Sequence, residues 1–152
     1  MDEIFRQVYN DVNTKVSPED IDSWLSNIDD SQYNYLEHKT TSILREEIDD
    51  LLSAYPLYRE KWVDSLKMYR AINDLRELRL GNHTRWVVPD QDKLHSGGYL
   101  TKVDFREKGV YLLCEINKRV KMQVKMENTF IFQKLTPEEW VIIMANEFNT
   151  SS

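Results

Sequence analysis

The sequence predicts an α+β fold, with helices in the first half and an antiparallel sheet in the second. Before residue 81 apolar residues recur every three or four positions, and after it they alternate with polar residues. These are the periods of amphipathic helices and of half-buried strands. All four glycines lie after residue 80, where turns are needed. We therefore expect a helical region over residues 1–81 and a small antiparallel β-domain with a terminal helix over residues 82–152.

The first predicted helix begins at Ser17. Ser17 is a good N-cap, Pro18 suits the first helical position, and Glu19 and Asp20 complement the helix dipole. The apolar side chains that follow recur at helical spacing up to Ile28, so we expect one amphipathic helix here.

Two longer amphipathic runs flank Pro56. The first covers residues 33–55 with an interruption at Thr40, and the second passes through Trp62 and ends near Gly81. Proline disfavours helical geometry at the residue before it, so Pro56 should end the first run. Because the linker is short, the two helices should form an antiparallel hairpin, each helix about 30 Å long.

The second half predicts four strands and a short helix. Alternating or apolar segments cover residues 84–88, 99–105, 110–116 and 120–132, the last as one long strand. They predict a four-stranded antiparallel bent sheet or a small SH3-like barrel. Thr136 and the residues after it repeat the helix-start pattern, so residues 140–148 should form a helix that closes the sheet.

Facing and register follow from the same alternation. We expect Tyr99 and Val103 to share one face of their strand, with Lys102 on the other. Opposed residues on antiparallel strands share a face, so Phe105 should oppose Val110 across a four-residue loop. By the same argument Ile116 should oppose Val120, across a three-residue loop.

Composition limits the possible compartments. The formal charge is −6, and it is unevenly distributed: residues 1–80 hold 17 acidic and 10 basic side chains, whereas residues 81–152 hold 9 acidic and 10 basic ones.

The longest apolar run, residues 140–145, is too short to span a bilayer, so we expect no membrane span. The N-terminus lacks a signal-peptide pattern, so secretion is not expected. Cys114 is the only cysteine, which excludes an internal disulfide and favours a reducing compartment.

No motif indicates catalysis. His38, His83 and His95 have no second ligand at zinc spacing, and Gly97-Gly98 lacks the lysine and hydroxyl of a phosphate-binding loop. Cys114 shares a face with apolar neighbours, which predicts a buried and inert thiol. We therefore predict no catalytic residue, no cofactor, no metal site and no enzymatic activity.

A group of basic side chains is the main candidate interaction surface. Arg119, Lys121 and Lys125 lie on the polar face of one predicted strand, with Lys118 in the adjoining loop and Lys102 on another strand. They suit an ordinary solvated face, nucleic-acid phosphates or an acidic protein surface.

Two aromatic features bear on that choice. Sheets that bind nucleic acid usually add exposed stacking rings, and on the same face as the basic residues we find only Tyr111, which favours a protein partner. Arg85 and Trp86 form a second candidate contact, because a cation beside a large ring can anchor a partner, although Trp86 is equally suited to the core.

Part of the chain resembles a known group of proteins. The motifs in question are Asn73-Asp74-Leu75-Arg76-Glu77-Leu78-Arg79-Leu80-Gly81, Arg85-Trp86-Val87-Val88, Gly97-Gly98-Tyr99-Leu100, Val110-Tyr111-Leu112-Leu113, Met122-Gln123-Val124 and Thr129-Phe130-Ile131-Phe132-Gln133-Lys134. In this order they resemble a small β-domain in proteins of large nucleocytoplasmic DNA viruses. The resemblance covers about residues 73–134 and implies a viral protein packaged as a minor capsid or internal component. It supplies no active-site residue.

These observations together predict a non-enzymatic structural or interaction protein of a large DNA virus. Its expected partners are other protein subunits, either capsid proteins or further copies of the chain, and its expected location is the virion or the host cytoplasm. The alternative is a nucleic-acid-binding small β-barrel that uses the basic sheet face.

Overall fold

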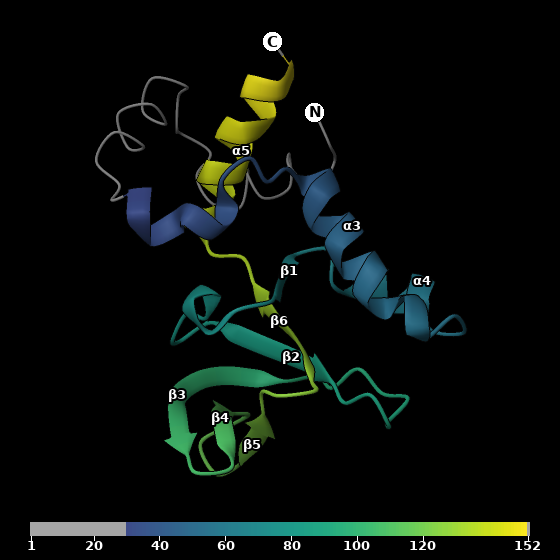
Figure 1. Cartoon of the computed structure of the whole chain (residues 1–152), viewed down its shortest axis with the longest axis vertical. Coiled ribbons are helices and arrows are strands. Elements are labelled where there is room, and N and C mark those ends of the chain that lie inside the picture. Colours follow the sequence, from purple (N-terminus) through teal and green to yellow (C-terminus); the bar gives the residue numbers. More distant parts are fainter. Residues whose placement is uncertain (1–29, 152) are drawn as a thin grey trace. The chain divides into compact units, whose positions relative to one another are not determined.

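The computed structural model describes residues 30–151, which fall into two compact units (Figure 1). One unit is Arg45–Lys134. The other combines the described residues up to Leu44 with those from Leu135 onward. The helix expected after Ser17 lies outside the described residues. Within residues 30–151 no helix has both the length and the apolar character needed to cross a bilayer.

The C-terminal helix α5 (Pro137–Ser151) begins with a capping box. The backbone N–H of Thr136 donates to Glu139 Oε1 at 3.0 Å, and the backbone N–H of Glu139 donates to Thr136 Oγ1 at 3.1 Å. Two N–H groups that have no partner within the helix are thereby satisfied. The helix predicted over residues 140–148 is confirmed and is longer at both ends, whereas its closing of the sheet stays a prediction.

Helix α3 (Thr41–Leu51) begins against α5. Glu147 accepts hydrogen bonds from both the backbone N–H and the hydroxyl of Thr41, each at 2.9 Å. The side-chain amide of Asn146 donates to the carbonyl of Leu36 at 2.9 Å. The interruption of the apolar spacing at Thr40 therefore marks the place where this helix starts.

The predicted helical hairpin is wrong. The second helix was expected to run to Gly81, but Tyr69–Ile72 is a strand that pairs with Phe130–Lys134, and three of its four residues are buried. This strand is short and mostly apolar, and its apolar residues Tyr69 and Ile72 also fit the helical spacing of three. The elements in place of the hairpin are η1 (Asp30–Leu36), α3, η2 (Leu52–Ala54), α4 (Arg59–Ser65), β1 (Tyr69–Ile72) and η3 (Leu75–Glu77).

The sheet has six strands, all antiparallel, in the order β1-β6-β2-β3-β4-β5. It is open, with β1 and β5 at its edges, and β3 curves strongly in Figure 1. The predicted four-stranded sheet or SH3-like barrel is therefore wrong. The remaining strands are β2 (His83–Val87), β3 (Gly98–Arg106), β4 (Gly109–Glu115), β5 (Lys121–Lys125) and β6 (Phe130–Lys134).

The long strand expected over residues 120–132 is two strands. The chain turns between β5 and β6, with Asn128 in the left-handed region at φ 61° and the Thr129 N–H donating to the Met126 carbonyl at 3.3 Å. β5 pairs with β4 at one edge, whereas β6 lies between β1 and β2. Met122 and Val124 of β5 and Phe130 and Phe132 of β6 all occupy even positions, so the alternation alone does not show the break.

Strand β3 contains an irregularity that changes which residues share a face. Its pairing with β4 shifts by one residue between Leu100 and Lys102, as in a β-bulge. Leu100 is fully buried, while Tyr99 and Lys102 lie on the opposite face. The expectation that Tyr99 shares a face with Val103 is therefore wrong.

Both predicted registers are confirmed. Phe105 pairs with Val110, although Arg106 and Gly109 also pair, so the loop is shorter than expected. The Ile116 N–H donates to the Val120 carbonyl at 2.9 Å, which continues the register of β4 and β5.

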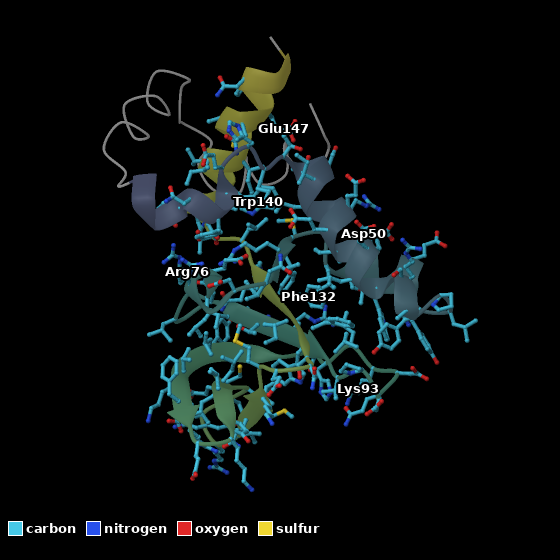
Figure 2. The ribbon with its side chains drawn as sticks, viewed as in Figure 1. Asp50, Arg76, Lys93, Phe132, Trp140 and Glu147 are labelled. Carbon is cyan, nitrogen blue, oxygen red and sulfur yellow. The ribbon has the colours of Figure 1, made fainter. Side chains whose placement is uncertain are left out.

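The two faces of β6 belong to different cores. Phe132, labelled in Figure 2, is fully buried against α3, η2 and α4. Ile131, on the other face, is buried in a second cluster that includes Ile72 of β1 and Val124 of β5. Because residues from both edge strands enter the second cluster, the open sheet is curled around it.

Gly97 and Gly98 permit close approach between neighbouring strands. A Cβ on Gly97 would lie 2.0 Å from the Thr84 carbonyl oxygen, and one on Gly98 would lie 2.6 Å from that of Glu115. Gly97 also has φ +80°, which disfavours other residues. This glycine pair therefore has a structural role.

The capping box yields a stability prediction. We expect Thr136→Ala to lower the free energy of unfolding by about 1 kcal/mol, because the Glu139 N–H loses its acceptor. Thr136→Ser keeps the hydroxyl and should match the wild type. Urea denaturation followed by circular dichroism measures both variants, and equal stability of the two would show that the cap contributes nothing.

Candidate functional site

A groove of about 1080 Å³ lies beside the edge strand β5, entirely within the sheet unit. Its polar margin includes exposed side chains from the loop after β2 and from the turn after β5. Apolar surface with a few polar groups around it is typical of sites that take a ligand or a partner segment. The two methionines of the floor add adaptability, because unbranched side chains repack easily. The floor is formed by Trp86, Met122, Val124, Met126 and Ile131.

One wall of the groove is held by the loop after β2. The ring of His95 stacks on Trp86, with centroids 5.3 Å apart and an interplanar angle of 21°. The His95 N–H donates to the Trp86 carbonyl at 2.9 Å, and Arg85 Nε donates to the His95 carbonyl at 2.9 Å. Trp86 is only 2% exposed. Of the predicted contact pair, Trp86 therefore lines the groove, and Arg85 holds the loop after β2 in place through the His95 carbonyl.

The groove brings a histidine near acidic side chains without forming a catalytic pair. His95 shares the margin with Asp90 and Glu127, but its Nε2 lies 3.3 Å from the side-chain amide oxygen of Gln91. Burial lowers the pKa of His95, and Lys93, which Figure 2 shows on the same loop, lowers it further. Within residues 30–151 no hydrogen bond joins His95 to a carboxylate, so the arrangement that orients a general base is not formed here.

The backbone of β5 is unpaired on the side away from β4. Val120 and Met126 flank the strand: Val120 accepts a hydrogen bond from the Ile116 N–H just after β4, and Met126 donates to the Val110 carbonyl of β4. In an antiparallel pair these bonds come from every second residue, so Lys121, Gln123 and Lys125 direct their N–H and C=O groups outward. No other described strand pairs there. This free backbone edge runs beside the groove.

The predicted basic residues divide between a face and a turn. Lys102, Lys121 and Lys125 are exposed on the face of β3, β4 and β5 that points away from the second core, which we call the outer face. Lys118 and Arg119 are exposed in the turn between β4 and β5. Lys125 Nζ is 3.8 Å from Glu127 Oε2.

The outer face also carries aromatic rings that the sequence analysis missed. Tyr99, 56% exposed, contacts the His83 ring edge to face at 5.2 Å between centroids. The Tyr69 hydroxyl lies 2.8 Å from His83 Nδ1. Burial lowers the pKa of His83, and the nearby charges of Arg85 and Lys134 add to this effect. The shifted register of β3 is the signal that places Tyr99 here, and the alternation did not reveal it.

Metal binding finds no support in the described residues. Between residues 30 and 151 no three His, Cys, Asp or Glu side chains gather closely enough to hold a metal ion. Cys114 is fully buried. Its environment is that of a structural thiol rather than of a nucleophile.

The lowered pKa of His83 predicts a pH dependence of stability. The unfolded chain takes up this proton near the usual pKa of 6.5, before the folded chain does, so the free energy of unfolding should fall as pH drops below about 7. His83→Gln removes this contribution, so its stability should change less than that of the wild type between pH 8 and pH 5.5. Urea denaturation at both values tests this, and an undiminished change in the variant would contradict it.

The buried thiol predicts low reactivity. Burial raises the pKa of Cys114 to about 11, which leaves about one thiolate in ten thousand at pH 7. We expect slow reaction with Ellman's reagent in the folded protein and fast reaction in urea. Equally fast labelling of the folded protein would show that the thiol is accessible.

Comparison with known proteins does not assign this chain to a family: no family model, no curated protein and no solved structure matches it.

Proposed function

We propose that the chain is a non-enzymatic interaction protein whose groove receives an extended segment of another protein. The observation that carries the proposal is the free edge of β5 beside an apolar floor. An added strand would pair with the outward groups of Lys121, Gln123 and Lys125. Every second side chain of that strand would then point toward Met122 and Val124, because successive residues alternate between faces.

The side chains of β5 limit which segments can pair with it. Lys121 and Lys125 stand at the two ends of the strand and are exposed. Lysines on an edge strand discourage pairing with most other strands. A strand that places acidic residues directly opposite these lysines is instead attracted to the edge. The preferred segment therefore alternates apolar residues with acidic ones.

Charge distribution supports an acidic partner. Residues 45–134 hold 17 basic and 14 acidic side chains, whereas the rest of the chain holds 3 basic and 12 acidic. Oppositely charged surfaces steer association and fix its orientation. A second copy of this chain is one source of acidic residues. The assignment to a virion, with capsid proteins as partners, rests on the resemblance over residues 73–134 and stays a prediction.

A backbone substitution at Gln123 tests strand addition. Peptides selected from a displayed random library on the full chain would be titrated by isothermal calorimetry against Gln123→Pro and Gln123→Ala. Proline removes only an outward N–H and should weaken binding about tenfold or more, the equivalent of one hydrogen bond of about 1.4 kcal/mol. Alanine keeps that N–H and should bind like the wild type.

Two results would overturn the proposal. Failure of the library to yield any binding peptide would show that the groove does not take extended segments. Equal affinity of Gln123→Pro and Gln123→Ala, with both variants melting like the wild type, would show that the β5 edge is not used. Sedimentation of the wild type and Gln123→Pro then shows whether a second copy uses the same edge.

A further inference from the structure

The outer face of the sheet combines the exposed ring of Tyr99 and the half-buried ring of Tyr111 with exposed lysines, and we infer that it binds single-stranded nucleic acid. It uses rings and lysines of the outer face rather than the apolar floor or the free backbone edge of the groove, so this inference does not depend on the proposed function. Rings on a sheet surface stack bases, and nearby cations contact the phosphates. The residues concerned are Tyr99, Tyr111, Lys102, Lys121 and Lys134, with His83 beside Tyr99.

Tyr99 belongs to a line of three rings that crosses the sheet. His83 lies between Tyr69 and Tyr99, with centroid distances of 6.0 Å and 5.2 Å and edge-to-face angles of 71° and 83°. The Tyr69 hydroxyl is also 2.8 Å from His83 Nδ1. These contacts hold the ring of Tyr99 in place although more than half of its surface is exposed. A base that stacks there meets a ring already ordered, which reduces the entropy lost on binding.

Tyr111 provides a second stacking position on the neighbouring strand. The Arg106 guanidinium lies 4.6 Å from the centroid of the Tyr111 ring, and its Nε is 2.9 Å from Asp104 Oδ2. A guanidinium fixed over an aromatic ring has a flat surface of its own, and bases stack on such planes as well as on rings. The ion pair with Arg106 also offsets the negative charge of Asp104 on this face.

Cations surround the rings. Lys134 pairs with Tyr69 in the sheet, and Lys121 lies one strand beyond Glu115, which is itself paired with Tyr99. Residues 98–134 hold eight basic and four acidic side chains, so this part of the chain is positive although the whole is at −6. Glu115, the cross-strand partner of Tyr99, is an acidic side chain beside the line of rings, and we expect it to lower the affinity for phosphates.

Stacking distinguishes this ligand from an acidic protein. An acidic protein would use the lysines and have no need of Tyr99, whereas a single strand uses both. A duplex hides its bases and would contact only the cations. Affinity that depends on the Tyr99 ring therefore identifies a single strand.

Fluorescence anisotropy with the full chain tests the inference. The probes are labelled fifteen-nucleotide dT and rU single strands and a duplex of equal length, titrated at several KCl concentrations. We expect the single strands to bind more tightly than the duplex, with affinity falling as salt rises by a logarithmic slope of about −0.7 for each phosphate contacted. Tyr99→Ala should weaken single-strand binding about tenfold, and Tyr99→Phe should preserve it.

Matched charge variants complete the test. Lys121→Glu should lower the affinity and make it less dependent on salt. Lys61→Glu makes the same charge change on α4, at a residue that is not part of the proposed site, and should change neither. All variants should melt like the wild type. No binding at the lowest salt, equal binding of the duplex, or unchanged binding by Tyr99→Ala would each overturn the inference. Gln123→Pro should leave nucleic-acid binding intact, which separates this site from the groove.

Discussion

Strand β6 lies between β1 and β2 with both faces covered, and the whole sheet unit depends on that placement. Its backbone pairs on both sides, and Phe132 and Ile131 enter separate cores. The fully buried Gln133 accepts a hydrogen bond from the Arg79 N–H at 2.9 Å and donates to Thr84 Oγ1 at 3.0 Å. A buried amide is costly unless it is hydrogen-bonded. Gln133 therefore favours this one position of β6 over a register slip, which would leave it unsatisfied.

The central position of β6 also creates the groove. The chain completes β5 at the sheet edge and must cross to the centre before β6 begins, so no later strand among residues 30–151 pairs with the free side of β5. The turn around Asn128 makes this crossing and contributes to the groove margin. One topological step thus explains both the exposed backbone edge and the apolar floor beside it. A meander, in which each strand pairs with the next, would have covered that edge.

Local chemistry predicted the parts of the fold that depend on neighbouring residues. Thr136 and Glu139 lie three positions apart, and the opposition of Phe105 to Val110 follows from a short turn. The pairing of β1 with β6 joins residues about sixty positions apart, and the cost of closing that loop leaves no local signature. Tyr69–Ile72 fitted a helical spacing because four mostly apolar residues cannot distinguish the two periods. The groove could not be predicted for the same reason, since its residues come from distant segments.

A shift of one residue in β3 changes the functional interpretation of the outer face. With strict alternation Tyr99 would lie with Val103 in the core, and the basic residues would have a single ring, Tyr111, among them. The shift between Leu100 and Lys102 instead places Tyr99 beside His83 and on the same face as Lys102. Strict alternation assigns every side chain of a strand to a face by its odd or even position. One extra residue in the strand reverses that assignment for all the residues after it. Which side chains share a face of β3 therefore depends on where its register shifts, and this shift brings Tyr99 to the face that carries Lys102.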